Sequence, residues 1–365
     1  MLRLARPLPL ALALCLMPPL AACPIEPPAH STAEEAGDEG AGERGQATDE
    51  APEELFEVLR VVDGDTIHIQ RKGKKEKLRL LSVDTEERMR GGDFNPSKPE
   101  TVFGEECAKW AIRFFRDLAD EDGKTRVGVR FPEGKEAYDV YGRLLCHVIL
   151  ADGRDFNLLL VQLGKSPYFN KYGNSLICHE AFLEAQRKAR AEELGIWHPQ
   201  TNEPKTPGAQ AAKRNYDELL PWWDALAQAV DGFRKRAREN PDAVLASEDA
   251  DGIDAALNAK REVEIFGRVY RTFEESNGDL TVLFRANEGD PGVRAIVPRK
   301  LRKELLAELD LEATSRGMRQ NYVSVTGPLR KGRRGPELRT SSVEQWRLGG
   351  PEPAAKTPAE AGAPR

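Results

Sequence analysis

Residues 57–83 read EVLRVVDGDTIHIQRKGKKEKLRLLSV, and apolar and polar residues alternate in three runs of this stretch. Alternation of this kind is typical of β-strands that bury one face. The pattern predicts strands over Glu57–Val62, Thr66–Arg71 and Lys77–Val83. Arg71-Lys72-Gly73-Lys74 supplies a hairpin turn between the second and third strands, because glycine tolerates the backbone angles of a tight turn.

The residues that follow add elements of both kinds. Apolar residues recur with helical spacing in Val102–Leu118. Two further strands are predicted at Arg126–Phe131 and Leu144–Leu150, and two further helices at Phe156–Leu163 and Cys178–Glu193. Hairpin-connected strands with one early helix and two late helices favour a small Greek-key β-barrel with helices packed on it. The OB-fold is the commonest member of this α+β class.

The second half of the chain shows a related pattern. Residues 216–258 are helix-like and carry an apolar stripe that includes Trp222, Trp223 and Phe233. Five short strands and one helix are predicted after it, the helix being Arg299–Leu309 and the strands Val263–Arg271, Leu280–Arg285, Val293–Val297, Tyr322–Leu329 and Pro336–Thr340. A helix between the third and fourth of five strands is the OB pattern, so we expect a second OB-like barrel.

Charge divides the chain of 365 residues further. Its net charge is −6, but Ile25–Leu55 holds ten acidic residues and one arginine, so that stretch alone carries −9 and the remainder about +3. The acidic stretch lacks aromatic residues after Pro24 and predicts a disordered tether. The predicted segments are a signal peptide (1–22), tether (23–55), first barrel (56–200), linker (201–215), helical segment (216–258), second barrel (259–348) and disordered tail (349–365).

The N-terminus has the features of an export signal. Met1–Arg6 is basic, and Pro7–Leu20 is apolar but too short and too proline-rich to span a bilayer. Leu20-Ala21-Ala22-Cys23 resembles a bacterial lipobox, which implies cleavage before Cys23 and lipidation of its thiol. The alternative is an ordinary cleavage site with an incidental cysteine. The lipobox interpretation predicts a protein of the cell envelope, lipid-anchored to a bacterial membrane and facing the periplasm or the exterior.

Three segments of the first barrel carry acids and arginines, namely Val62-Asp63-Gly64-Asp65-Thr66, Arg79–Glu87 and Asp139-Val140-Tyr141-Gly142-Arg143. Each by itself is an ordinary turn or strand edge. Together they bring carboxylates and two arginines to neighbouring strand ends. Carboxylates suit a hard cation such as Ca²⁺, and arginines bind phosphate with two oxygens at once. This set can stabilise a phosphorane-like transition state, while one carboxylate positions or deprotonates a water molecule.

The order and spacing of these segments, with the closing Leu194-Gly195-Ile196-Trp197, resemble the thermonuclease (staphylococcal-nuclease-like) family from about Phe56 to His198. The resemblance implies a calcium-dependent phosphodiesterase that cuts DNA and RNA and leaves 3′-phosphates. It also implies roles for seven residues: Asp65, Asp84 and the carbonyl of Thr85 as calcium ligands, Glu87 for the attacking water, Arg79 and Arg143 for phosphate, and Tyr141 in the nucleotide pocket.

One position departs from the family. Glu86 stands where members normally have proline. Proline fixes φ, so its loss predicts a looser loop around Glu87, with an added negative charge beside the cation site. Because the six catalytic and calcium-binding positions are all retained, we favour a nuclease. The alternative is a catalytically inactive nucleic-acid-binding lipoprotein with two OB-like modules.

The second module has its own candidates for nucleic-acid binding. The turn Arg330-Lys331-Gly332-Arg333-Arg334-Gly335 is basic and would attract a phosphate backbone. Four aromatic residues are candidates for stacking on bases, although several must belong to the core: Phe266, Tyr270, Phe273 and Phe284. The alternative is a solvated hairpin on a structural module. The expected partners are DNA and RNA as substrates and a membrane through the lipid anchor, and no protein partner is implied.

Overall fold

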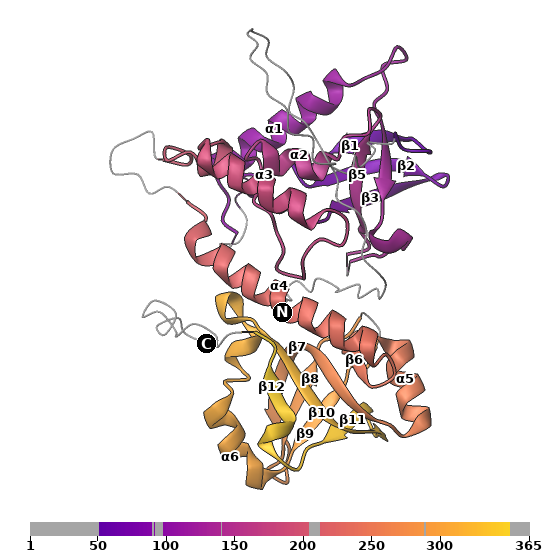
Figure 1. The fold of residues 1–365 in the computed structure, drawn as a ribbon, viewed down its shortest axis with the longest axis vertical. Coiled ribbons are helices and arrows are strands. Elements are labelled where there is room, and N and C mark those ends of the chain that lie inside the picture. The colour runs from indigo at the N-terminus through magenta and orange to yellow at the C-terminus, as the bar shows by residue number, and fades with distance from the viewer. Residues whose placement is uncertain are drawn as a thin grey trace, which may run out of the picture.

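The computed structural model of the chain describes residues 51–89, 91, 98–139, 141–203, 212–287 and 290–350. Two β-barrels lie at opposite ends of the molecule with one long helix between them (Figure 1). The predicted signal peptide, Cys23, and most of the predicted tether and tail lie outside the described residues. No helix in the described part combines the length and apolar character needed to cross a membrane.

The first barrel is closed, with strand order β1-β2-β3-β5-β4 and β4 pairing back onto β1. Its strands are β1 (Phe56–Val61), β2 (Thr66–Arg71), β3 (Lys74–Leu80), β4 (Arg126–Arg130) and β5 (Leu144–Leu150). The predicted strands are confirmed, but β3 begins and ends three residues earlier than expected. Lys72 and Gly73 both have positive φ, 49° and 74°, and form a two-residue turn, so pairing continues to its edge.

Three helices cover this barrel, as the sequence predicts: α1 (Val102–Asp117), α2 (Phe156–Gln162) and α3 (His179–Ala191). The hydroxyl of Thr101 accepts a hydrogen bond from Gly104 N at the start of α1. The carboxylate of Asp155 caps α2 in the same way. Phe115 of α1 and Phe156 of α2 pack edge to face at 4.7 Å inside a single apolar core, which fixes both helices on the barrel.

The predicted helical segment 216–258 is not one helix. It contains α4 (Tyr216–Glu239), a short strand β6 (Val244–Ala246) and α5 (Ala250–Ala259). The sequence does mark the break, because Pro241 follows the C-cap Asn240 and proline disfavours helical backbone in the residue before it. β6 then pairs in parallel with β7 and adds an edge strand to the second barrel.

The second barrel has the connectivity of the first. Its strands are β7 (Glu262–Glu274), β8 (Leu280–Phe284), β9 (Arg294–Val297), β10 (Tyr322–Gly332) and β11 (Gly335–Arg339), with helix α6 (Arg299–Glu308) before β10. They close in the order β7-β8-β9-β11-β10, and β9 and β11 pair in parallel as β3 and β5 do. The expected second OB-like barrel is confirmed, with an additional edge strand β12 (Trp346–Leu348).

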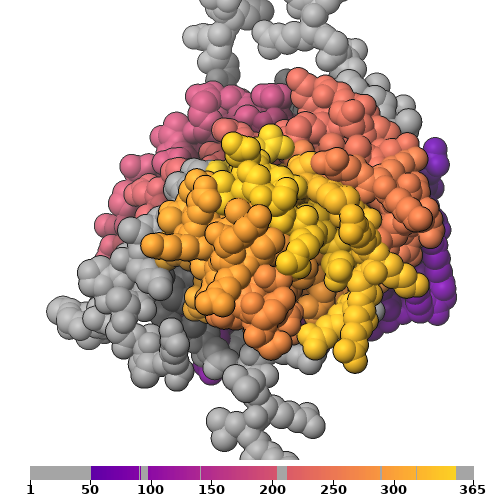
Figure 2. All heavy atoms as spheres, turned by 90° about the horizontal axis from the view of Figure 1, so that it is seen from below, coloured from indigo at the N-terminus to yellow at the C-terminus, as the bar shows by residue number. Residues whose placement is uncertain are grey.

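Helix α4 packs against both barrels. On one side, Asn170 donates from its amide to Asp224 of α4 at 2.8 Å. On the other side, Phe233 of α4 stacks on Phe266 of β7 with ring centroids 4.5 Å apart. Figure 2 looks at the end of the molecule formed by the second barrel, whose orange and yellow residues make up the near face. The two barrels are therefore held in one arrangement by a shared helix.

Candidate active site

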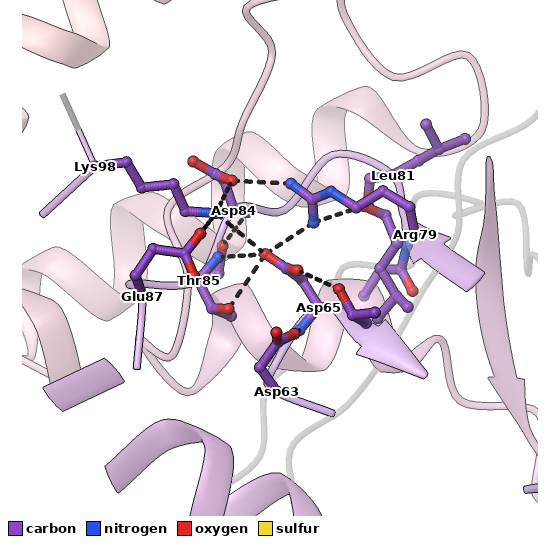
Figure 3. A network of polar contacts seen from close by, with 12 residues as sticks. Asp63, Asp65, Arg79, Leu81, Asp84, Thr85, Glu87 and Lys98 are labelled. Atoms are coloured by element: carbon purple, nitrogen blue, oxygen red, sulfur yellow. Dashed lines mark hydrogen bonds and ion pairs between the residues drawn. The ribbon is translucent and has the colours of Figure 1, made fainter. Parts of the chain in front are cut away.

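Most of the predicted acidic and basic residues gather where β1 and β3 end and β2 begins (Figure 3). Asp65 lies in the turn between β1 and β2, and its backbone carbonyl accepts a hydrogen bond from Leu80 N at the end of β3. Arg79 is the penultimate residue of β3, and Asp84 follows in the next loop. Strand pairing thus brings residues that are up to 19 positions apart in sequence, 65 and 84, to one end of the barrel.

Gly64 allows the Asp65 turn to lie against the loop that carries Thr85. A Cβ atom at Gly64 would come within 2.6 Å of Thr85 Cγ2 and 2.9 Å of Cys107 Sγ. The close contact lets Thr85 donate to Asp65 Oδ2 from both its backbone N–H, at 3.0 Å, and its hydroxyl, at 3.2 Å. Glycine is required at this position because any side chain would collide with the loop that packs directly against the turn.

Arg79 bridges the two buried aspartates. Its Nη1 lies 2.8 Å from Asp65 Oδ2 and its Nη2 lies 2.8 Å from Asp84 Oδ1. Burial by itself would raise the pKa of both carboxyls, but neighbouring cations outweigh it and hold both pKa values below their usual range. Both aspartates are therefore ionised, as ligands of a hard cation must be.

Lys98 is a member of this site that the sequence did not reveal. Its ammonium lies 2.8 Å from Asp84 Oδ1, 2.9 Å from Glu87 Oε1 and 3.9 Å from Asp65 Oδ2 (Figure 3). Burial opposes its charge, but Asp84 and Asp65 raise the pKa of Lys98 above its usual value. The two carboxylates predicted to bind a cation and the one predicted to act on water thus converge on one positive charge, and this donor set fits a divalent cation at the same position.

Arg214, which lies just before α4 and far from the other site residues in sequence, also reaches the site. Its Nη1 donates to the backbone carbonyl of Asp84 at 2.9 Å, and its Nη2 pairs with Asp84 Oδ2. The guanidinium is buried between the rings of Tyr216 and Trp223, at 5.7 and 5.1 Å from their centroids. Residues 201–215 were predicted to be a linker, and no local pattern marked Arg214 as part of a site 130 residues away.

Glu86 does not loosen its loop as its replacement of proline predicted. Its side chain is buried and accepts hydrogen bonds from Thr101 Oγ1 at 2.5 Å, Asn202 Nδ2 at 2.7 Å and the Tyr216 hydroxyl at 3.0 Å. The carboxylate therefore ties the loop to the start of α1 and to the region before α4. The backbone next to it is also fixed, because Glu87 O accepts from Thr101 N at 3.0 Å.

Arg143 and Tyr141 form a separate group. Arg143 Nε donates to Asp139 Oδ2 at 2.6 Å, and its guanidinium lies 5.4 Å from the centroid of the Tyr141 ring. The side chain of Tyr141 is exposed. The register of β3 and β5 pairs Arg79 with Leu145, so Arg143 is two residues from the partner of Arg79. The barrel brings the two arginines to the same region, but Arg143 binds its own turn and not Asp65 or Asp84.

One more group of potential metal ligands occurs within the described ranges. His147, Asp155 and Cys178 are buried, and one ligand atom of each lies within 4.8 Å of the others. Asp155 Oδ2 lies 2.5 Å from His147 Nδ1, and its Oδ1 accepts from the backbone at the start of α2. Both carboxylate oxygens are thus engaged in linking α2 to β5, which accounts for the group as part of the core.

Comparison with known proteins assigns the first barrel to a family. Residues 77–199 match the family described as staphylococcal nuclease homologue. The chain is 31% identical to the thermonuclease of Staphylococcus hyicus over 148 residues, which is 40% of this chain and 78% of that protein. It belongs to the staphylococcal nuclease homologue family. It is also 34% identical over 143 residues to endonuclease YhcR of Bacillus subtilis, covering 39% of this chain and 11% of that protein. The family match ends before Arg214 and the second barrel.

Proposed function

We propose that the protein is a calcium-dependent endonuclease that hydrolyses phosphodiester bonds in DNA, RNA or both. The observation that carries this proposal is the convergence of Asp65, Asp84 and Glu87 on one positive charge beside Arg79. Family membership supports the same reaction class, since two relatives are named thermonuclease and endonuclease. By the same resemblance, we propose 3′-phosphate products.

The chain's own residues divide the work in this proposal. Asp65, Asp84 and the carbonyl of Thr85 would hold Ca²⁺, which when bound supplies positive charge to the scissile phosphate. Glu87 is the most exposed of the carboxylates, with 42% of its side chain accessible, so it is placed to orient a water molecule or take its proton. Lys98 contacts only one of its two carboxylate oxygens, Oε1, and thereby holds the side chain beside the aspartates.

Arg79 and Arg143 would bind the phosphate. Arg79 is buried and held by two aspartates, so its guanidinium is pre-oriented and fully charged. Arg143 is partly accessible beside the exposed ring of Tyr141, which can stack on a base of the substrate. Release of Arg143 from Asp139 would let its fork bind two phosphate oxygens.

Digestion of single-stranded DNA with Ca²⁺ or with EDTA tests the proposal. Cleavage should require Ca²⁺, and Glu87→Gln and Arg143→Ala should each slow it by roughly 100-fold or more, the range of a lost general base or charge-stabilising group. Exposed Glu121→Gln and Arg113→Ala are matched controls and should cleave as the wild type does. Unchanged cleavage by both site variants, or salt-sensitive DNA binding without turnover in millimolar Ca²⁺, would overturn it.

We also propose a lipid anchor at Cys23, supported by the Leu20-Ala21-Ala22-Cys23 sequence alone. The mature protein should begin at Cys23 and carry acyl chains, and globomycin should block its processing. The test is the intact mass of the protein purified from the membrane fraction, with Cys23→Ala as the control. A mature wild-type protein without lipid would overturn this assignment.

A further inference from the structure

One face of the second barrel carries a row in which arginines and aromatic rings alternate. Tyr270 lies between two guanidinium groups, with its ring centroid 5.2 Å from Arg285 Cζ and 5.9 Å from Arg271 Cζ. Phe273 also lies between two, at 5.5 Å from Arg271 and 5.4 Å from Arg294. These five residues, which we call the Arg–aromatic row, come from β7, the end of β8 and the start of β9.

Burial separates the row from the core. Of the four aromatic residues considered from the sequence, Phe266 and Phe284 are each only 1% exposed and belong to the core. Tyr270 is 44% exposed, and Phe273 is half-buried. A bulge in β7 between Val269 and Arg271 shifts the strand register at this point, so consecutive side chains Tyr270 and Arg271 contact each other. The row is therefore partly open to solvent, with Tyr270 and Arg271 exposed and Phe273, Arg285 and Arg294 half-buried.

The row has excess positive charge. Within the described residues, no carboxylate lies at ion-pair distance from Arg271, Arg285 or Arg294, whose neighbours are the aromatic rings. Burial and then the nearby Arg268 lower the pKa of Arg285, although Glu248 acts in the opposite direction. Other arginines of this barrel do have acidic partners, in the pairs Arg302–Glu274, Arg339–Asp279 and Arg347–Glu264. An anion bound to the row would relieve the repulsion between its guanidinium groups.

The row lies on the side of the second barrel that faces the candidate active site. Arg285 N donates to the backbone carbonyl of Arg268 at 2.9 Å. The guanidinium of Arg268 lies 5.5 Å from the centroid of the Tyr172 ring, which belongs to the first barrel's side of the molecule. Tyr172 in turn lines one cavity together with Arg79. The second barrel thus presents its basic aromatic face toward the side of the molecule that carries Arg79.

We propose that the Arg–aromatic row is a binding site for single-stranded nucleic acid, which it delivers to the first barrel. Unstacked bases lie on the rings of Tyr270 and Phe273, and phosphates pair with Arg271, Arg285 and Arg294. Alternating rings and guanidiniums match the alternating bases and phosphates of one strand, whereas a duplex hides its base faces. Only the later fate of the strand rests on the proposed nuclease function.

Binding of a fluorescein-labelled oligothymidylate of about 20 nucleotides tests this site. The full chain is titrated in EDTA, so that cleavage is not scored, and anisotropy reports the dissociation constant. Tyr270→Ala should weaken binding about tenfold, and Tyr270→Phe should leave it nearly unchanged because the ring is kept. Arg271→Ala should reduce the slope of log K against log salt by about 0.7, the value for one phosphate contact on a single strand. Urea unfolding checks that each variant is folded.

The matched control is the double variant Arg333→Ala/Arg334→Ala in the basic turn between β10 and β11. This variant loses two positive charges, as Arg271→Ala/Arg285→Ala does. Only Arg271→Ala/Arg285→Ala should weaken oligonucleotide binding by tenfold or more. Equal losses would show general charge attraction and overturn the proposal, as would wild-type affinity in Tyr270→Ala. If the wild-type protein binds the oligonucleotide but does not cleave it when Ca²⁺ is added, the nuclease function is overturned and the proposed binding site is retained.

Discussion

The contact between Arg214 and Asp84 offers a direct test of how the region before α4 supports the site. The perturbation is Arg214→Met, which keeps an unbranched apolar chain between Tyr216 and Trp223 but removes the guanidinium. Asp84 then loses the two contacts that Arg214 makes, one to its backbone carbonyl and one to Oδ2. It keeps the ion pairs of Oδ1 with Arg79 and Lys98.

The magnitude follows from burial. A charge-assisted hydrogen bond contributes about 1.5–3 kcal/mol, and removal of one partner of a buried pair costs about 3–5 kcal/mol when the other is left alone. Asp84 is not left alone, and removal of Arg214 also abolishes that side chain's own desolvation cost. We therefore expect the free energy of unfolding to fall by about 2–3 kcal/mol.

Equilibrium urea unfolding of the full chain measures this change. A double-mutant cycle with Asp84→Asn should give a coupling free energy of about 1–2 kcal/mol, because the two groups are in contact. Lys213→Met is the control, since Lys213 pairs with Glu203 and both side chains are about half exposed, so its loss should change stability by less than about 0.5 kcal/mol. A fall no larger than that of Lys213→Met, or a coupling energy near zero, would refute the reasoning.

Three further predictions concern Lys98, Glu86 and Lys171. Lys98→Met removes the ammonium that a divalent cation must displace. The affinity for Ca²⁺, measured by calorimetry, should therefore rise roughly tenfold, which is about 1.4 kcal/mol. A fall in this affinity would contradict the proposed cation position. Glu86→Ala removes the acceptor of three hydrogen bonds and should lower the free energy of unfolding by about 2–3 kcal/mol in a urea titration, with Glu86→Gln intermediate; an unchanged midpoint would show that the loop is held in another way. Burial and then Arg268 lower the pKa of Lys171 to about 7 in the folded protein, so stability should rise as pH increases from about 7 to about 10, where only the unfolded chain still binds the proton. Lys171→Met should remove that rise and be more stable at pH 7 by up to about 4 kcal/mol, and an identical pH profile in both proteins would count against the shift.

Much of the fold could be predicted from local sequence. Alternation in Thr66–Arg71 and a nearly continuous apolar run in Leu144–Leu150 placed two strands with the bounds that the structure has. The turn at Lys72 and Gly73, in contrast, placed β3 three residues earlier than the alternating run, from Lys74 to Leu80, because backbone pairing continues up to the edge of a tight turn that keeps two strands in register. Pro241 marked the end of α4, and the error over 216–258 came from extending the helix-like segment past this proline, although its apolar stripe ends at Phe233.

The candidate site could be predicted only in part. Asp65, Arg79 and Asp84 lie in motifs whose spacing is local, and the barrel brings them into contact. Lys98 and Arg214 have no such motif, and each reaches Asp84 by a side-chain contact across a loop or across the molecule. The orientation of Glu86, away from the cation position and toward Thr101, also depends on what surrounds it in space.

Periodicity and turn chemistry in the chain itself determined that there are two five-stranded barrels, which face of each strand is buried, and where the acidic and basic motifs lie. These are properties of neighbouring residues, and the free energy that enforces them comes from burying apolar side chains at a period of two or 3.6. Barrel closure and the docking of α4 decided which charges neutralise each other, and barrel closure also decided that Arg285 and Tyr270 meet on one face of the second barrel. Such contacts join residues far apart in sequence, and electrostatic pairing depends on distance in space and on burial, neither of which a local pattern encodes.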